Sequence, residues 1–196
     1  MRRYLGRVFI LIAALSCSRP PSTGLSDNPP DFAVYQAVID SVLTPRILGP
    51  VNKLVVLDST PAIEVESLTG VADFYRLSEV DSGLVRDFAL RNREPHSLNA
   101  LKALSAKLPI FVVEGKVLRS LPHGDPEKYW EEFYKLYPGS TGHISLSSIG
   151  YNKYRSVAML IVDRGCGSLC GSGDIVTLKR IGAKWRVTGI QNMWVS

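Results

Sequence analysis

Hydrophobic side chains recur at helical spacing in the first part of the chain. After Asp31, which can cap a helix, apolar residues fall at intervals of three and four along one face until Pro45. These residues are Phe32, Tyr35, Val38, Ile39 and Val42. We expect this first helix to pack by its apolar face. A second helix is predicted over residues 81–91.

A third helix, over residues 125–137, has the clearest signals. Asp125 can accept hydrogen bonds from the free N–H groups of the first turn, and Pro126 suits that turn because its missing N–H is not needed there. Aromatic residues follow one face of this helix: Trp130, Phe133, Tyr134 and Tyr137. We interpret them as a stripe that faces the core; a ligand groove is the alternative.

Short apolar runs predict strands between these helices. Residues 53–58 contain the run Leu-Val-Val-Leu, which is too short and too β-branched for a buried helix, and residues 62–65 would continue this strand. A second strand covers residues 110–113, with a turn at 114–116. Residues 93–108 carry no clear pattern.

From residue 143 onwards, apolar positions alternate with polar ones, which is typical of half-buried strands. Turn residues divide this part into the strands 143–151, 155–162, 173–179 and 184–194. Consecutive strands usually pair, so the simplest topology is an antiparallel meander. The sequence therefore predicts an α+β fold, with helices in the N-terminal part and a C-terminal antiparallel β-meander, in one globular domain of residues 31–196.

Residues 1–17 have the order of an export signal. A basic start with three arginines precedes an apolar run that would span about 12 Å as a helix, too short to cross a bilayer. Residues 14–17 (Ala-Leu-Ser-Cys) resemble the lipobox of bacterial lipoproteins, although Ala14 stands where that family usually has Leu. The resemblance implies cleavage before Cys17 and lipid attachment to Cys17. An ordinary secreted protein, in which this cysteine is incidental, is the alternative.

Residues 18–30 predict a flexible tether, because they are rich in proline and have little apolar surface to bury. The expected location is the cell envelope, anchored to a membrane. In a cell with two membranes this means the outer membrane or the periplasmic face, since Ser18 lacks the acidic character that retains many lipoproteins at the inner membrane.

The charge balance argues against a nucleic-acid partner. The chain carries +5 overall, but three of its 23 basic residues and none of its 18 acidic residues lie in the signal, which leaves +2 for the remainder. Such a balance is not typical of a nucleic-acid-binding protein. The partners that we expect are the membrane, through the lipid anchor, and an unidentified envelope protein.

The three cysteines are an odd number, which is explained if Cys17 carries a lipid. Cys166 and Cys170 then remain, and in an oxidising compartment we expect them to form a disulfide. They stand in a Gly-rich segment, residues 165–173, which we predict as a cross-linked loop whose glycines adopt positive φ angles. The candidate binding residues of this loop are Gly165, Gly167, Ser168, Gly171, Ser172 and Gly173.

The Gly-rich segment invites three sharper interpretations. A phosphate cradle would need the helix and the Lys-Ser/Thr pair of a P-loop, and a redox site would favour Cys-x-x-Cys over the Cys-x3-Cys spacing present here. Half of a zinc site would need two further ligands, and the three histidines of the chain stand at no recognisable spacing. We predict no catalytic residue, no metal site and no cofactor.

Several short segments of the C-terminal third form a distinctive set. They are 130–134 (WEEFY), 147–152 (SSIGYN), 166–173 (CGSLCGSG), 184–187 (KWRV) and 194–196 (WVS). As a set they resemble a family of uncharacterised bacterial envelope lipoproteins, which mostly has Phe where this chain has Tyr151. The family has no assigned activity, so the resemblance favours the meander and the cysteine pair but implies no substrate.

Two functions of different classes follow. The first is an exported, membrane-anchored lipoprotein that acts as a non-enzymatic binding or structural protein of the envelope. The alternative is a small envelope hydrolase or transferase that uses the Gly-rich segment as part of its site. An enzyme should bring Ser, His or carboxylate groups together in a pocket beside that segment, whereas a binding protein need not.

Overall fold

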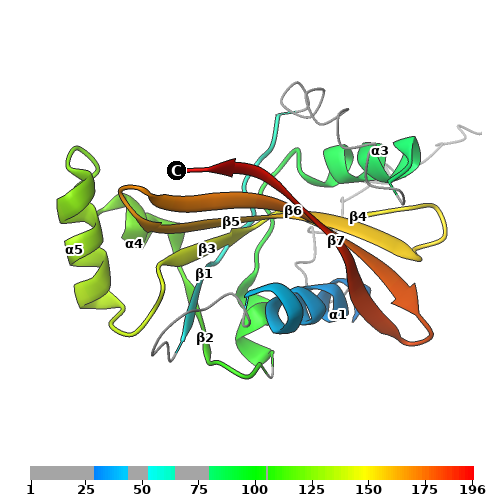
Figure 1. Ribbon diagram of the computed structural model, residues 1–196, viewed down its shortest axis with the longest axis horizontal. Coiled ribbons are helices and arrows are strands. Elements are labelled where there is room, and N and C mark those ends of the chain that lie inside the picture. The colour runs from blue at the N-terminus through cyan, green and yellow to red at the C-terminus, as the bar shows by residue number, and fades with distance from the viewer. Residues whose placement is uncertain (1–28, 44–52, 65–79, 105) are drawn as a thin grey trace, which may run out of the picture.

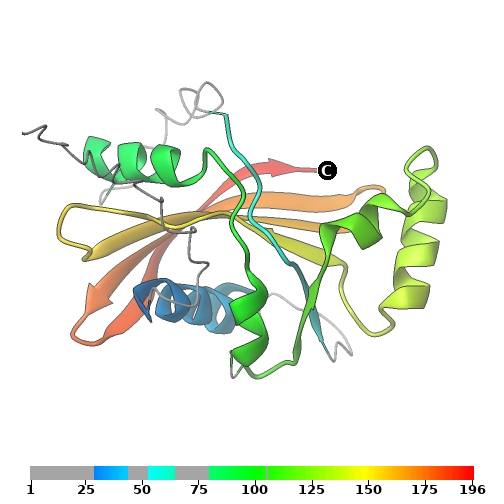
Figure 2. The same ribbon diagram turned by 180° about the vertical axis from the view of Figure 1, so that it is seen from behind.

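The computed structural model describes residues 29–43, 53–64, 80–104 and 106–196 (Figure 1). The predicted signal, Cys17 and most of the predicted tether lie outside these residues. The described residues form a mixed sheet with helices on both faces, which confirms the predicted α+β fold (Figures 1 and 2).

The sheet has seven strands: β1 (Leu54–Leu57), β2 (Ile110–Val113), β3 (His143–Leu146), β4 (Gly150–Tyr151), β5 (Val157–Gly167), β6 (Cys170–Ile181) and β7 (Lys184–Val195). Their order is β2-β1-β3-β5-β6-β7, and β4 pairs with β5. Strands β3, β5, β6 and β7 are antiparallel neighbours, as predicted for the meander. β1 pairs in parallel with both β2 and β3, so the N-terminal strands extend the meander into a mixed sheet.

The predicted strand 143–151 is divided into β3 and β4 by Ser147. Its backbone N–H donates to the Ile161 carbonyl at 3.0 Å, and its hydroxyl accepts a hydrogen bond from the Ile161 N–H at 2.8 Å. A side chain therefore takes the place of a backbone group in the ladder, and the chain leaves the β3 register before β4 begins.

The predicted helices are present, with a shifted start for the first. α1 (Pro29–Val38) continues in a π-helical turn, η2 (Ile39–Leu43). Asp31 lies inside the first turn rather than capping it, and the predicted tether overlaps the helix by two residues. Prolines suit the first helical positions, because their fixed φ and missing N–H do no harm there.

The second and third predicted helices are α3 (Ser82–Arg91) and α5 (Pro126–Leu136). Asp81 caps α3 by accepting a hydrogen bond from the Leu84 N–H at 2.7 Å. Asp125 caps α5 in the same way, with the Lys128 N–H at 3.1 Å. The capping signal of Asp125 was thus sufficient to locate the start of α5.

Two predictions for the segments that connect these elements were wrong, and a segment without a prediction contains a short helix. Residues 62–64 form no strand, because the chain leaves the sheet after β1 and the Ile63 N–H donates to the Asn92 carbonyl at 2.7 Å. The expected turn at 114–116 is the start of α4 (Gly115–Arg119), where the Gly115 N–H donates to the Asp58 carboxylate at 3.1 Å. The unassigned stretch contains a 3-10 helix, η4 (Asn99–Ala103).

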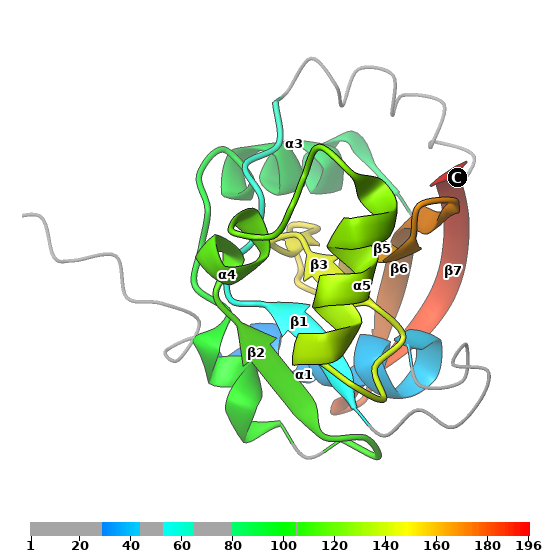
Figure 3. The ribbon, with the colours of Figure 1, turned by 90° about the vertical axis from the view of Figure 1, so that its left-hand side faces the viewer.

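The core lies on both faces of the sheet. On one face, α1, η2 and η4 pack against alternate strand residues such as Leu160 and Val176. On the other face, α3 packs against Met159 and Ile161. α4 and α5 cover the β1–β2 end of that second face (Figure 3). The α3 and α5 helices therefore stand apart on the same face, with the ends of β6 and β7 between them (Figure 1).

Candidate functional site

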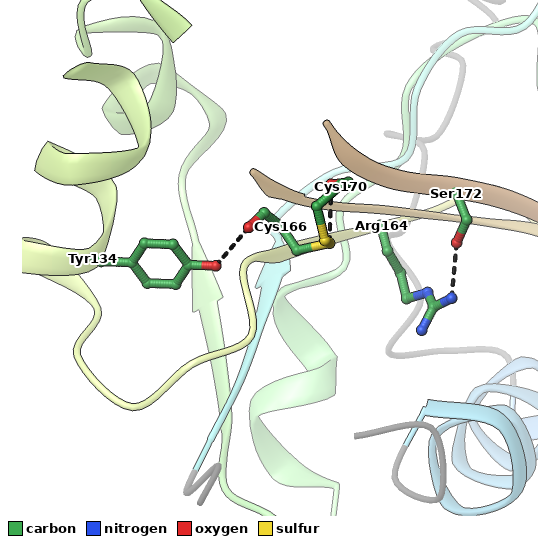
Figure 4. The surroundings of a disulfide bond; sticks show 5 residues. All are labelled: Tyr134, Arg164, Cys166, Cys170 and Ser172. Carbon is green, nitrogen blue, oxygen red and sulfur yellow. Dashed lines mark hydrogen bonds between the residues drawn. A yellow bond between two sulfur atoms is a disulfide. The ribbon is translucent and has the colours of Figure 1, made fainter. Parts of the chain in front are cut away.

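The paired cysteines lie at the tip of the β5–β6 hairpin, next to α5 (Figure 4). Cys166 and Cys170 form a disulfide with a Cα–Cα distance of 5.0 Å, which is usual for such a bond. The strands run into the Gly-rich segment from both sides, so only Ser168 and Leu169 connect them, and Cys166 is the extra residue of a β-bulge. The predicted disulfide is confirmed, whereas the predicted loop is mostly strand.

The glycines of this segment allow close packing rather than a strained turn. Throughout residues 165–173, all of which the structure describes, no glycine has a positive φ, contrary to the expectation. A Cβ atom on Gly173 would overlap the indole nitrogen of Trp194, and one on Gly171 would lie 3.0 Å from the same ring. A Cβ atom on Gly165 would lie 3.2 Å from the Trp130 ring. The glycines thus make room for two tryptophans.

The remaining residues of the predicted binding loop lie at separate places. Ser168 is exposed at the hairpin turn. Gly167 faces the side chain of Cys170, which a Cβ atom would meet at 3.2 Å. Ser172 is buried, and its hydroxyl accepts a hydrogen bond from Arg164 on the neighbouring strand at 2.8 Å (Figure 4). The two serines therefore do not converge on one site.

A partly buried carboxyl group lies beneath Trp194. The indole N–H of Trp194 donates to Asp163 Oδ1 at 3.1 Å. Burial raises the pKa of Asp163, while the hydrogen bond from Trp194 opposes the rise. The Trp194 side chain of β7 thus reaches across Gly173 of β6 to Asp163 of β5, so the pair links the two strands on either side of β6.

The aromatic stripe of α5 packs on the sheet, as predicted. Phe133 is fully buried, and Trp130 and Tyr134 are partly buried beside it. The Trp130 ring stacks on His143, with centroids 5.3 Å apart and planes at 10°, and the Tyr134 hydroxyl donates to the Cys166 carbonyl at 2.9 Å. Burial lowers the pKa of His143, which favours the neutral form of its ring.

A different site lies at the other end of the second face, where α3 meets the turn between β4 and β5. It is a cavity of about 440 Å³, a volume in the range of small-molecule sites. Its walls carry four basic side chains: Arg86, Arg91, Lys153 and Arg155. We call this cavity the basic pocket.

Two carboxylates lie at the basic pocket, and both accept hydrogen bonds from groups of the protein. Asp87, in the wall, accepts hydrogen bonds from the Tyr151 N–H at 2.7 Å and from Arg91 Nε at 3.0 Å. Asp31 of α1 lies behind the wall and accepts a hydrogen bond from the Tyr151 hydroxyl at 2.6 Å. Burial, and then this hydrogen bond, raise the pKa of Tyr151, so that its hydroxyl keeps its proton as a donor.

The two arginines nearest to Asp31 are held in place by Tyr151. The Arg155 guanidinium lies over the Tyr151 ring at 4.2 Å from the centroid, and that of Arg91 at 5.4 Å. Arg155 and Arg91 also approach Asp31 at 3.5 Å and 3.8 Å. These contacts fix two positive charges beside the cavity.

Sequence reasoning missed the basic pocket. Asp31 was predicted to cap a helix, and no role was predicted for Tyr151, yet the Tyr151 hydroxyl makes a buried hydrogen bond to Asp31. The four basic side chains of the wall come from α3 and the β4–β5 turn, and Asp31 behind them comes from α1, so the site joins segments that are distant along the chain. The one signal in the sequence was the hydroxyl of Tyr151, because a hydroxyl at a buried position indicates a hydrogen-bond partner nearby.

Within the residues that the structure describes, no three His, Cys, Asp or Glu side chains gather closely enough to bind a metal ion. Among the same residues, no helix has the length and apolar character needed to cross a bilayer. The predicted lipid attachment at Cys17 lies outside them and stays a prediction. Comparison with known proteins found no matching protein family, no matching curated protein and no matching solved structure.

Proposed function

We propose that this chain is an exported lipoprotein, anchored to a membrane of the bacterial envelope by a lipid on Cys17, and that its folded domain is a binding module. The anchor is supported by the sequence of residues 1–17. The Cys166–Cys170 disulfide agrees with it, because such bonds persist in oxidising compartments outside the cytoplasm.

The binding role rests on one observation, the basic pocket. Two of its four cations, Arg91 and Arg155, are held by internal contacts before any ligand arrives, since Asp87 fixes Arg91 and the Tyr151 ring supports both. A site whose side chains are already ordered loses less conformational entropy when a ligand binds. The pocket is therefore suited to hold a ligand rather than to reshape around one.

The alternative, a hydrolase or transferase built on the Gly-rich segment, has less support. Backbone N–H groups of such a segment would have to face an open space to bind a substrate oxyanion. Instead, Trp194 packs on Gly171 and Gly173, and Trp130 packs on Gly165. These rings occupy the space that the alternative needs.

The anchor is tested by metabolic labelling with a fatty acid, comparing the parent protein with Cys17→Ser. We expect label in the membrane-bound parent and none in the variant, which should be uncleaved or soluble. Cys166→Ser/Cys170→Ser is the matched control, because it removes the other two cysteines and should still take up label. A parent protein without label would refute the lipoprotein proposal.

A further inference from the structure

We propose that the basic pocket binds a ligand through a phosphate group. The charges in and behind its walls do not balance: four basic side chains face two carboxylates, Asp31 and Asp87. Like charges that converge on one cavity repel each other, and an anion placed between them relieves this cost.

The excess positive charge belongs to Arg86 and Lys153. Asp87 is bonded to Arg91, and Asp31 lies close to Arg91 and Arg155. In the described part of the chain, no carboxylate pairs with Arg86 or Lys153. The pocket thus offers two cations beyond those that its own acids neutralise, which matches a phosphate of up to two negative charges better than a single carboxylate.

Arg155 has donors that the protein leaves unused. Its Nε and Nη2 atoms are buried and make no hydrogen bond, although Nη2 lies 3.5 Å from Asp31. Its side chain is still 39 % exposed, so a small shift of the guanidinium on the Tyr151 ring would bring these donors to an acceptor in the pocket. Guanidinium groups bind phosphate oxygens in pairs, which is the arrangement that would use these donors.

The backbone presents Arg155 at a cost. Arg155 has a φ of 50°, and within the described chain it is the one residue other than glycine with a positive φ. This region is disfavoured for residues with a Cβ atom, and strain of this kind is concentrated at functional sites. The turn is held by Asn152, whose side-chain oxygen accepts hydrogen bonds from the Ser156 and Val157 N–H groups. The arginine is thereby fixed at the rim of the pocket.

The place of the pocket suggests where the phosphate comes from, and this step rests on the proposed anchor. Asp31, behind the pocket wall, is the third residue of α1, and α1 starts at Pro29, within the last two residues of the predicted tether. A chain of residues 18–28 reaches at most on the order of 40 Å when fully extended. An anchored domain therefore keeps the pocket near the bilayer, where phospholipid headgroups present phosphate diesters, each with one negative charge, as the membrane counterpart of free phosphate esters.

The test measures binding by the mature, detergent-purified protein to inorganic phosphate and to glycerol 3-phosphate by calorimetry. Arg86→Gln/Lys153→Gln should weaken glycerol 3-phosphate binding about tenfold, because each charge contributes on the order of two- to fivefold at a partly exposed site. The control Lys102→Gln/Lys128→Gln removes the same charge from exposed positions elsewhere and should leave the affinity unchanged. Melting curves of both variants should match that of the parent.

A second arm separates the two sources of phosphate and does not depend on the lipid anchor. Full-length protein with Cys17→Ser is mixed with phosphatidylcholine vesicles, with or without phosphatidylglycerol. Binding of glycerol 3-phosphate alone assigns the pocket to soluble esters, and additional vesicle binding lost in Arg86→Gln/Lys153→Gln assigns it to headgroups. No binding in either arm, or an equal loss in the control variant, would overturn the proposal. A failed fatty-acid label would refute the anchor and leave the calorimetric result standing.

Discussion

Replacing Gly150 with alanine should force α3 away from the sheet. The added Cβ atom would lie 2.5 Å from Phe88 Cβ and 2.7 Å from Phe88 Cα, in the middle of the helix. Carbon atoms that are not bonded to each other pack at about 3.5 Å or more, so α3 would have to move by about 1 Å. Phe88 is 1 % exposed and belongs to the core beneath α3, which leaves it no space to yield.

Two contributions set the size of this effect. Overpacking of a core contact costs about 1–3 kcal/mol. The movement also strains the hydrogen bonds that hold α3 to the sheet, from the Tyr151 N–H to Asp87 at 2.7 Å and from the Ser148 N–H to Asn92 at 2.8 Å, each contributing about 1 kcal/mol. We therefore expect the free energy of unfolding to fall by about 3–5 kcal/mol. For a chain of this size the melting temperature should drop on the order of 10 °C.

The assay is urea unfolding followed by tryptophan fluorescence, with Gly124→Ala as the matched control. A Cβ atom on Gly124 would meet no heavy atom within 4 Å, so this variant should stay within about 0.5 kcal/mol of the parent. If Gly150→Ala is as stable as Gly124→Ala, the contact between α3 and β4 is not formed as described, and the reasoning fails.

Three further perturbations test other parts of the structure. Phe133→Ala should lower the free energy of unfolding by about 3–5 kcal/mol because Phe133 is fully buried, whereas Leu136→Ala on the same helix, at a side chain 53 % exposed, should cost less than about 1 kcal/mol; equal losses would remove α5 from the core. Mass spectrometry of the alkylated, non-reduced protein should find Cys166 joined to Cys170, and reductant should cost about 2 kcal/mol, as expected for so short a loop; two freely alkylating thiols would contradict the disulfide. Burial lowers the pKa of His143 in the folded protein, so on acidification the unfolded chain binds a proton at this ring before the folded protein does. The free energy of unfolding should therefore fall as the pH drops below about 6.5, the ordinary pKa of histidine, and His143→Gln should flatten this pH dependence. The same pH dependence in the parent and in His143→Gln would show that the ring is not buried.

The features predicted from sequence are those whose causes are local. α5 was located because Asp125, Pro126 and the aromatic stripe act within four turns of one helix. The apolar run at the start of β5 reflects a strand that is covered on both faces, on one by α1 and on the other by α3. The meander followed because β5, β6 and β7 each pair with their neighbour in sequence.

The features that were missed depend on parts of the chain that meet only after folding. Nothing near β1 indicates that it pairs in parallel with both β2 and β3. We predicted that the glycines of the Gly-rich segment form a turn. The sequence near them gave no sign of their actual role, because Trp194, which packs on Gly171 and Gly173, comes from β7. Glycine can serve either a backbone conformation with positive φ or the close approach of a neighbouring side chain, and the sequence alone does not distinguish these two roles.

The segment 147–152, one of the distinctive segments of the C-terminal third, has a structural role that its sequence alone did not suggest. The Ser147 carbonyl accepts a hydrogen bond from the Tyr35 hydroxyl of α1 at 2.8 Å, and the Ser148 N–H donates to Asn92 at the end of α3. Gly150 lets α3 approach the strand. The helical layers on both faces are therefore joined to the sheet through one short stretch of chain.

The same stretch builds the wall of the basic pocket. Tyr151 bonds Asp87 of α3 through its N–H and Asp31 of α1 through its hydroxyl, and so links the two helices across β4. Asn152 then closes the turn that presents Arg155. Because the residues that hold the layers together also position the arginines, the pocket can loosen only if the packing of α1 or α3 loosens. Binding in the basic pocket should therefore stabilise the whole fold, as any ligand that favours the native state does.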